Sequence, residues 1–239
     1  MVTNPRKKSG KGAARGPSKA PRPAKRQKTE GTREALIAAA KKLFSEKGYD
    51  ATSVKDLSNE AGVNISLVSY HFGGKENLYQ ACLQEFAESK LAAAERILKP
   101  PSSCEEFKVR IRMFVEELIR SCEAEPEVTK IIDRDIHLSK AITERIFRET
   151  FLYVYETSVE FFRTSQKLGI MQTGFDPLIV ASLLFGSVMH LNRMEGLSQK
   201  ILGRSLRDAA HRAAAIDHIQ TIFVNSLLMP IADRQRGEA

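Results

Sequence analysis

Apolar residues recur at helical spacing along most of the chain from Thr32 onward. In the first such run they stand at i, i+3, i+4, i+7 and i+8, which places them on one face of an α-helix. Thr32 is positioned to cap this helix at its start, and Gly48 is positioned to end it. The apolar face consists of Leu36, Ala39, Ala40, Leu43 and Phe44.

Further segments have the same spacing, or are bounded by residues that start and stop helices. Ser53 and Asp56 stand in capping-box spacing, and Asn64 can cap the helix that follows Gly62. No segment alternates with a period of two between turn signals, so the pattern predicts an all-α fold of about nine helices. After the first, the predicted helices are residues 54–61, 65–72, 75–98, 104–123, 127–135, 140–168, 177–195 and 206–229.

Charge separates residues 1–31 from the rest of the chain. Ten Lys or Arg and one acidic residue give this segment a net charge of +9, which leaves the remainder at −1. The segment contains four prolines and no Leu, Ile, Phe, Tyr or Trp, so it cannot bury enough apolar area to offset the entropy of ordering. We predict a disordered basic arm, either one that grips DNA phosphates or a minor groove, or a solvated leader without a specific role.

Composition narrows the classes of protein further. The hydrophobic content of 42% and charged content of 28% are typical of a soluble globular chain. The longest apolar stretch, near residues 178–189, is interrupted by Ser182, Gly186 and Ser187 and is too short for a membrane span. The three cysteines include no C-x-x-C pair and no apolar export signal precedes them, which predicts reduced thiols in a cytosol-like compartment.

The sequence contains none of the common catalytic or metal-binding motifs. It has no H-E-x-x-H and no G-x-S-x-G, and Gly73-Gly74-Lys75 lacks the leading Gly and trailing Ser or Thr of a P-loop. Asp133, Asp135 and His137 lie close together, but their spacing on a helix points them in different directions. We therefore expect neither an enzyme nor a protein with a metal or cofactor.

Residues 53–72 form two short predicted helices around a tight turn. Ala61 is small enough for the helices to approach closely, and Gly62 can adopt a left-handed φ at the turn. This is the layout of a helix-turn-helix, whose second helix enters a major groove of DNA. Its inward face consists of Val54, Leu57, Ala61, Val63, Val68 and Phe72.

Residues 32–79 resemble the tetracycline-repressor (TetR) family of bacterial transcription regulators. The resemblance lies in the run from Thr32 to Phe44, then Gly48-Tyr49, then ATSVKDLSNEAGVNISLVSYHFGGKENLY at 51–79. It implies a three-helix DNA-binding domain over residues 32–79, a helical ligand-binding and dimerisation domain over 80–230 and a C-terminal tail over 231–239. It also implies a cytoplasmic, nucleoid-associated regulator.

The resemblance assigns DNA contacts to particular residues. Tyr70 and His71 match phosphate contacts at the end of the recognition helix, and Lys75 matches a phosphate-binding lysine at the start of the next helix. Ser53 is expected to contact phosphate, to cap its helix, or to do both. Base contacts are expected from Lys55, Asn64, Ile65, Ser66, Leu67 and Ser69. Ile65 and Leu67 depart from the family's usual polar residues, and their alternative role is packing within the motif.

The larger domain is expected to hold an effector pocket and to dimerise through its last two long helices. Aromatic and Met side chains suggest an apolar pocket, although they also fill ordinary cores. The pocket candidates are Met113, Phe114, Phe147, Phe151 and Tyr155. Two stripes at helical spacing are the interface candidates: Leu183, Leu184, Val188 and Leu191 on one helix, and Ile216, Ile219, Phe223 and Leu227 on the other. Such stripes also form internal cores.

These observations predict a sequence-specific regulator that binds a palindromic operator of double-stranded DNA as a homodimer. We expect it to act as a repressor that responds to a small-molecule effector. One alternative is a non-specific, architectural DNA-binding protein that uses its basic arm. Another is a helical enzyme or small-molecule carrier with a decayed DNA motif.

Overall fold

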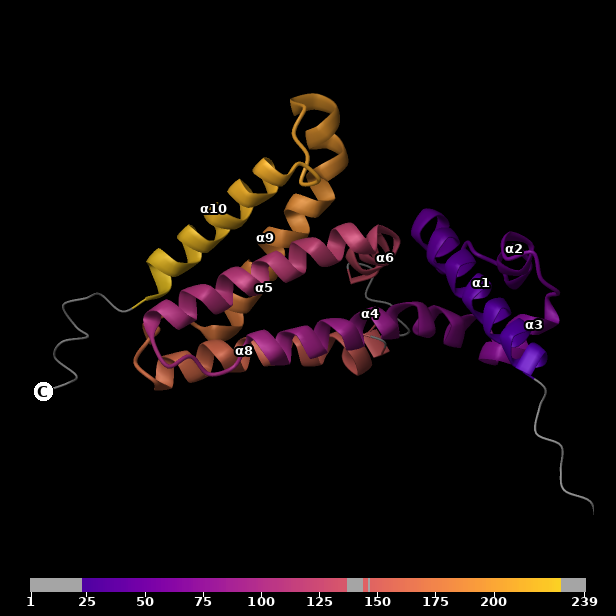
Figure 1. The fold of residues 1–239 in the computed structure, drawn as a ribbon, viewed down its shortest axis with the longest axis horizontal. Helices are drawn as coiled ribbons and strands as arrows, with labels where there is room; N and C mark the ends of the chain where they lie inside the picture. Colours follow the sequence, from indigo (N-terminus) through magenta and orange to yellow (C-terminus); the bar gives the residue numbers. More distant parts are fainter. Residues whose placement is uncertain (1–22, 137–143, 146, 229–239) are drawn as a thin grey trace, which may run out of the picture.

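The computed structural model describes residues 23–136, 144–145 and 147–228, and in these residues the chain is helical (Figure 1). An isolated β-bridge joins Met171 to Leu228. The elements are α1 (Pro23–Lys47), α2 (Val54–Glu60), α3 (Ser66–Phe72), α4 (Lys75–Ile97), α5 (Cys104–Ala124), α6 (Pro126–Ile136), η1 (Phe147–Phe151), α8 (Leu152–Lys167), α9 (Pro177–Leu197), η2 (Ser198–Leu202) and α10 (Ala209–Leu227). The all-α prediction is confirmed for this part of the chain.

Helix α1 begins earlier than the sequence pattern predicted. It starts at Pro23, so Thr32 lies inside the helix rather than at its cap, and the prediction of disorder was wrong for residues 23–31. Proline is well tolerated in the first turn of a helix, and the Ala, Lys, Arg, Gln and Glu residues that follow have favourable helix propensities. The rest of the predicted arm, residues 1–22, lies outside the described residues.

Two hydrophobic cores are joined by α4. The first half of α4 contributes Leu78 and Tyr79 to a core shared with α1, α2 and α3, and its last turns contribute Ala94 and Ile97 to the larger core. Figure 1 shows α4 running from the small helical domain into the larger bundle. The helix therefore connects the two domains without an intervening loop.

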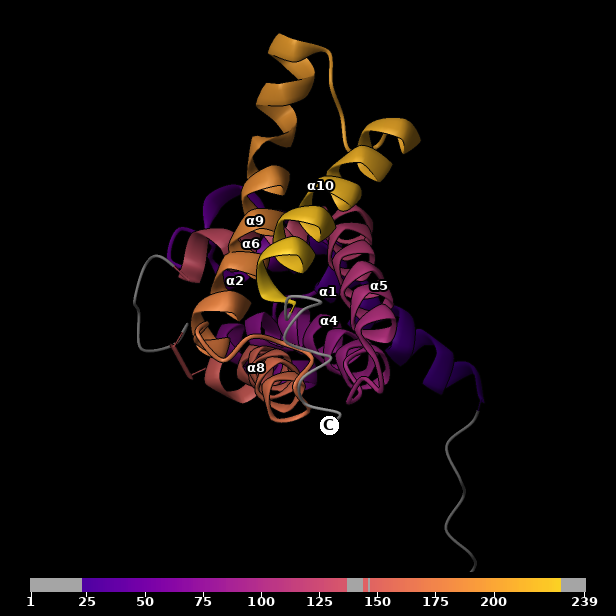
Figure 2. The ribbon, with the colours of Figure 1, turned by 90° about the vertical axis from the view of Figure 1, so that its left-hand side faces the viewer.

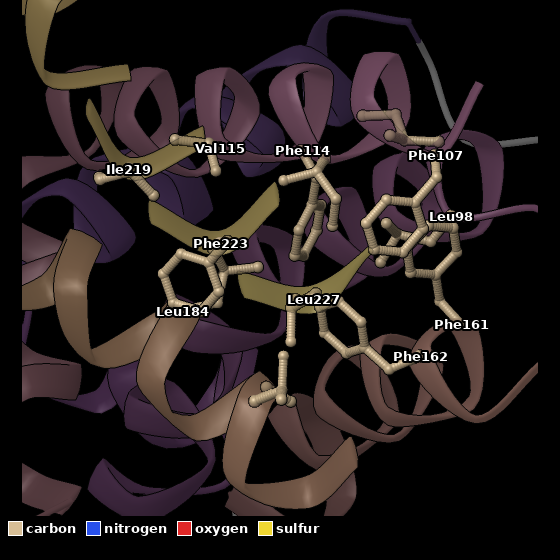
Figure 3. Packing of buried hydrophobic residues seen from close by; sticks show 14 of the residues in the cluster. Leu98, Phe107, Phe114, Val115, Phe161, Phe162, Leu184, Ile219, Phe223 and Leu227 are labelled. Carbon is tan, nitrogen blue, oxygen red and sulfur yellow. The ribbon is translucent and has the colours of Figure 1, made fainter. Parts of the chain in front are cut away.

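The larger core consists of side chains from α4, α5, α8, α9 and α10. Figure 3 shows Phe107, Phe161 and Phe162 meeting at one end, and the rings of Phe107 and Phe161 stack with centroids 5.4 Å apart. Leu184, Phe223 and Leu227 meet the same core from α9 and α10. This packing fixes the helices that flank the candidate ligand site.

The predicted helices of residues 140–168 and 206–229 differ in the structure. The described part of the first consists of residues 144–145, the π-helical turn η1 and then α8. Helix α10 begins only at Ala209, because the side chain of Asp208 accepts a hydrogen bond from the backbone N–H of Ala210 at 2.8 Å and so caps the helix there. In Figures 1 and 2, η2 and the connection to α10 stand away from the rest of the molecule.

Helix α6 belongs to the core of the small domain, although it follows the larger domain's α5 in sequence. Its Val128 and Ile131 are fully buried among the residues of α1 to α4. Lys41 of α1 forms an ion pair of 2.7 Å with Glu125, which directly precedes α6. The small domain and the larger domain are thus packed together through α6 as well as α4.

A buried carboxylate lies at the centre of this contact. Asp135 of α6 accepts hydrogen bonds from the Tyr79 hydroxyl and from Nε of Arg134, the latter at 2.9 Å. Arg134 also donates to the backbone oxygen of Phe44 at 2.7 Å, near the C-terminus of α1. Burial and the neighbouring Asp135 carboxylate raise the pKa of Tyr79, so its hydroxyl stays a hydrogen-bond donor at neutral pH.

We expect Tyr79→Phe to lower the free energy of unfolding by about 1–3 kcal/mol, because it leaves a buried carboxylate with one donor fewer. Urea denaturation followed by circular dichroism measures this change. Tyr153→Phe is the matched control, because the Tyr153 side chain is exposed and should tolerate the same change. Equal stability of the two variants would show that the Tyr79 hydroxyl does not support Asp135.

Candidate nucleic-acid interface

The turn between α2 and α3 is built by local hydrogen bonds. Ser53 accepts from the backbone N–H of Asp56 at 3.0 Å, and the Asp56 carboxylate accepts from the backbone N–H of Ser53 at 2.9 Å. This reciprocal pair confirms the predicted capping box at the start of α2. The Ser53 hydroxyl lowers the pKa of Asp56, with help from the Ser53 backbone N–H, so the cap is ionised at neutral pH.

Helix α3 is oriented by a glycine on each side and by Asn64. Gly62 has φ of 64° in the turn and Gly73 has φ of 75° after the helix, conformations that residues with a Cβ rarely adopt. The side chain of Asn64 accepts from the backbone N–H of Ser66 at 2.9 Å, although the cap position of α3 is Ile65 rather than Asn64. Val68 and Phe72 are buried on the inner side of α3, so the opposite face of this helix is presented outward.

Most of the predicted DNA-contacting residues lie on that outward face. The Tyr70 side chain is 74% exposed and that of Ile65 is 50% exposed. A half-exposed isoleucine on a recognition helix is available to pack on thymine methyl groups. The other residues exposed on or beside this face are Ser53, Lys55, Asn64, Ser66 and Ser69, and His71 is half-buried.

The structure does not place two of the predicted DNA contacts where the prediction needs them. Leu67 is half-buried and packs against the small-domain core, so its position fits the alternative of packing within the motif. Lys75 donates hydrogen bonds to the backbone oxygens of Tyr49 and Thr52, each at 2.9 Å. Its ammonium also lies 4.1 Å from the centroid of the Tyr49 ring. The ammonium is therefore engaged by the loop between α1 and α2 rather than held out toward a phosphate.

Burial accounts for the electrostatic state of Lys75. Desolvation lowers its pKa, as expected for an ammonium enclosed by carbonyl oxygens and an aromatic face. The sequence could not reveal this position, because both carbonyls belong to a loop more than twenty residues away. Lys75 fastens the start of α4 to the loop between α1 and α2, and no side chain in the described part of the chain caps the first turn of α4.

The sequence did not single out Arg33 as a residue of this surface. Arg33 is exposed on α1, and its guanidinium lies 5.4 Å from the centroid of the Phe72 ring at the end of α3. Arg33 therefore adds a cation near the C-terminal end of α3, the end at which the rings of Tyr70 and His71 meet edge to face at 5.1 Å. Hydroxyl, imidazole and guanidinium groups are all donors suited to phosphate oxygens.

Comparisons with known proteins agree with this geometry. The sequence model described as "Bacterial regulatory proteins, tetR family" matches residues 36–82. The HTH-type transcriptional dual regulator CecR of Shigella flexneri is 33% identical over 141 residues, which are 55% of this chain and 58% of CecR. The probable HTH-type regulator YttP of Bacillus subtilis is 24% identical over 54% of this chain and 63% of YttP. The chain therefore spans about three fifths of the length of these curated relatives.

Solved structures share the fold. KstR2 of Mycobacterium tuberculosis, titled a ketosteroid transcriptional regulator, has a TM-score of 0.63 at 18% identity and covers 83% of this chain and 95% of its own. A structure from Clostridium perfringens, titled "putative fatty acid metabolism regulator", has a TM-score of 0.68 at 15% identity. The match covers 82% of this chain and 100% of that one. Residues 36–82 are therefore similar to the TetR family of regulators, and these solved structures share the fold over 82% and 83% of the chain.

The TetR-family sequence match ends at residue 82, so it does not extend over the larger domain. A cavity of about 260 Å³ lies among α4, α5, α6, η1, α8 and α9. Phe147, Phe151 and Tyr155 line it as predicted, whereas Met113 and Phe114 do not. Met113 is exposed on α5, and Phe114 is buried one layer deeper, where its ring meets that of Phe185 edge to face at 5.8 Å.

The cavity also has walls that the sequence analysis missed. Helix α4 contributes Phe86 and Lys90, and α6 contributes Thr129 and Ile132. These residues come from elements that also pack in the small DNA-binding domain. Their role could not be read from one sequence, because a single Phe or Lys on an amphipathic helix carries no sign of which neighbour it faces.

The predicted dimer stripes are mostly internal in the structure. Leu184, Val188 and all four predicted α10 residues are buried in the larger core, and Leu191 packs against it. Leu183 is the exception, with 58% of its side chain exposed. The other faces of these helices also carry large exposed apolar side chains: Ile179 on α9 and Ile222 on α10. The predicted interface residues of α9 proved to be mostly internal because this helix is apolar on both sides. The helical spacing of its apolar residues therefore did not show which side faces the core.

Asp133 and Asp135, which lie close together in the sequence, each bind an arginine. Asp133 accepts two hydrogen bonds from Arg193 of α9, at 2.8 and 2.6 Å, and Asp135 is held by Arg134 and Tyr79. His137 lies outside the described residues. Among the described residues no group of three or more His, Cys, Asp and Glu side chains is placed to hold a metal ion.

We expect Lys75→Met to lower the free energy of unfolding by about 1–2 kcal/mol, because two carbonyl oxygens lose a charged donor while the volume is largely kept. Thermal and urea unfolding measure the effect in the absence of DNA. Lys55→Met is the matched control, since Lys55 is exposed and should change stability by less than about 0.5 kcal/mol. If Lys75→Met unfolds like the native protein, the clamp onto the α1–α2 loop does not contribute to stability.

Proposed function

We propose that this protein is a DNA-binding transcription regulator that recognises a palindromic operator as a homodimer. The observation that carries the proposal is the outward face of α3, where Ile65, Ser66, Ser69 and Tyr70 are exposed on a helix held by the turn at Gly62. A helix of this kind fits the major groove, with its end and the start of the next helix against phosphates. We also propose that the protein is cytoplasmic and that it acts by binding DNA rather than by catalysis.

Relatives support a regulatory role and favour repression. AcnR of Corynebacterium glutamicum, 28% identical over 51% of this chain and 67% of its own length, is named a transcriptional repressor. KstR2 of Rhodococcus jostii, 24% identical over 60% of this chain and 65% of its own, is also named a repressor. We propose repression for this chain, by a dimer that occupies the operator until an effector reduces its affinity.

The homodimer is supported by an unpaired apolar face. One helix-turn-helix reads only a half-site, and two reading helices about 34 Å apart require two chains. Within residues 177–202, an 18-residue window has a mean hydropathy of 1.2 and is long and apolar enough to resemble a membrane helix, yet only 22% of that window is buried within the chain. Leu183, Ile179 and Ile222 leave apolar side chains exposed on α9 and α10, and we propose that a second copy covers this face.

Effector response is supported by the position of the cavity. Phe86 and Lys90 of α4 line it, and Lys75 at the start of the same helix binds the α1–α2 loop. Lys90 and Lys75 are separated by about 22 Å of continuous helix at 1.5 Å per residue. We propose that an effector shifts α4, changes the spacing of the two α3 helices and so lowers operator affinity.

The alternative function is non-specific DNA binding through the basic arm. The net charge of residues 1–31 is +9, and a polycationic segment binds any DNA by counterion release. Of this segment the structure describes residues 23–31, which extend α1. The two functions differ in a measurable way, because an arm that binds only phosphates selects no sequence.

Selection of DNA duplexes with a randomised core tests the proposal. The full chain and a chain lacking residues 1–22 are each expected to enrich the same inverted repeat at about physiological salt. Tyr70→Ala should keep that motif and bind it on the order of tenfold more weakly, because a phosphate contact positions the protein without specifying sequence. Tyr153→Ala, on an exposed tyrosine of α8, is the control and should bind as the native protein does.

Two results of that selection would reject the regulator. Strong retention of DNA by the full chain without an enriched motif would favour the architectural alternative. Loss of all DNA retention when residues 1–22 are deleted would confirm that alternative. Unchanged affinity of Tyr70→Ala for an enriched operator would leave the regulator intact but remove Tyr70 from the contact surface.

We expect Leu183→Glu to convert a dimer into a monomer without unfolding it, because the new carboxylate enters the interface but replaces a side chain that is exposed in the single chain. Sedimentation equilibrium measures the mass of the native protein and the variant. Leu168→Glu is the matched control, because Leu168 is 53% exposed at the end of α8. A native monomer, or a Leu183→Glu dimer of native strength, would contradict the proposed face.

A further inference from the structure

The cavity in the larger domain has almost no polar wall. Its lining is dominated by aromatic and aliphatic side chains from five of the helices around it and from η1. In the part of the chain that the structure describes, Lys90 is the one charged residue that lines it. The chemistry of a ligand for this site therefore depends on whether the Lys90 ammonium is available.

The Lys90 ammonium is already compensated inside the protein. It donates to Oε1 of Glu117 at 3.0 Å and to the hydroxyl of Ser121 at 2.6 Å, and it lies 5.4 Å from the centroid of the Phe86 ring. Burial pushes the pKa of Glu117 up, but hydrogen bonds from Arg120 and Lys90 bring it below its ordinary value. Glu117 is thus ionised at neutral pH, and it pairs with Lys90 through Oε1 and with Arg120 through Oε2.

The hydroxyl groups of the wall are also occupied. Tyr155 donates to the backbone oxygen of Leu178 at 3.1 Å and is hydrogen-bonded to Ser182. Thr129 donates to the backbone oxygen of Glu125 at 3.0 Å. Throughout the described residues, no buried side-chain nitrogen or oxygen is without a hydrogen-bond partner. A polar ligand group that entered the cavity would lose its hydration and find only side-chain groups that already have a hydrogen-bond partner.

The volume sets the size of the occupant. A dry apolar cavity of about 150 Å³ accommodates benzene, and this cavity measures about 260 Å³. By proportion it holds on the order of ten non-hydrogen atoms, which is the size of naphthalene. Such a molecule would contact Phe86 of α4, Phe151 of η1 and Phe185 of α9.

We infer that the cavity takes small, uncharged, apolar molecules, and that the Lys90–Glu117 pair excludes organic anions of the same shape. The inference rests on the proposed function only in treating this molecule as the effector. The binding specificity itself follows from the cavity wall and holds for the protein without DNA. The Lys90–Glu117 pair is therefore a specificity device, placed between α4 and α5, rather than an anchor for an anionic head group.

Calorimetric titration of the full chain with naphthalene and with 2-naphthoate tests the inference. These probes share a ring system and differ by one carboxylate. We expect one naphthalene per chain and at least tenfold weaker binding of 2-naphthoate. Equal or tighter binding of the anion, or no binding of naphthalene at all, would overturn the inference.

Two substitutions separate exclusion by the ion pair from simple shape. Glu117→Gln leaves the Lys90 charge without its carboxylate, so 2-naphthoate should gain about tenfold in affinity while naphthalene changes little. Lys90→Met removes the cation and should leave naphthalene affinity within about threefold of native. If Lys90→Met instead abolished binding of 2-naphthoate that the native protein bound well, Lys90 would be an anion anchor and the inference would be wrong.

A bulky variant places the binding event in the cavity. Val188 lines the site, so Val188→Trp should abolish naphthalene binding, whereas Val109→Trp on the exposed side of α5 should not. Circular dichroism melting checks that both variants fold. Undiminished binding by a folded Val188→Trp would overturn the assignment to this cavity.

The operator assay distinguishes failure of this inference from failure of the proposed function. Selective naphthalene binding together with unchanged operator affinity supports the ligand class and contradicts effector coupling. A neutral cavity that fails to bind naphthalene, in a protein that still selects an inverted repeat, rejects the ligand class alone.

Discussion

The buried carboxylate of Asp135 constrains how the two domains of this protein fit together. An ionised group in a protein interior is stable only when other groups donate to it, and here the donors come from Tyr79 of α4 and Arg134 of α6. Arg134 adds a hydrogen bond to the end of α1. The three helices are consequently tied to one charge, and Val128 and Ile131 complete a core that sequence order alone would assign to two domains. A displacement of α6 must therefore carry α1 and α4 with it, or break the hydrogen bond from Arg134 to Phe44 or the one from Tyr79 to Asp135.

This arrangement gives the cavity two mechanical connections to the helix-turn-helix. One is α4, which begins at the Lys75 contact with the α1–α2 loop and passes the cavity at Phe86 and Lys90. The other is α6, whose Ile132 lines the cavity while its neighbour Ile131 is fully buried in the small-domain core. Two rigid connections make it hard for a ligand to alter one half of the small domain alone. Coupling of this kind requires a state in which both helices have moved, and the ligand must bind that state more tightly.

Local signals in the sequence were sufficient for the motif and insufficient for its surroundings. Ser53 with Asp56, Asn64, and the glycines at 62 and 73 act on their own neighbours within a few residues, so the helix-turn-helix could be predicted in detail. Lys75 could not, because its partners are backbone oxygens of a loop whose path depends on the whole domain. Leu183 and Leu184 show a second limit: both are apolar neighbours on α9, yet one is 58% exposed and the other fully buried. When both faces of a helix are apolar, periodicity gives the helix but not its inner side.

The compensated charge of Lys90 bears on how a ligand could act. A ligand that formed an ion pair with Lys90 would have to displace Glu117, and would alter a contact between α4 and α5 directly. A neutral ligand leaves that pair in place and can act only through the space it fills. Filling of the cavity would act on the π-helical turn η1, because Phe151 faces Phe86 of α4 with ring centroids 6.3 Å apart. The segment from Arg145 to Phe151 is also joined to α4 by polar contacts: Arg145 binds Glu76, and Glu149 binds Gln80. Separating η1 from α4 would therefore strain the two polar contacts that join this segment to the start of the helix that Lys75 anchors.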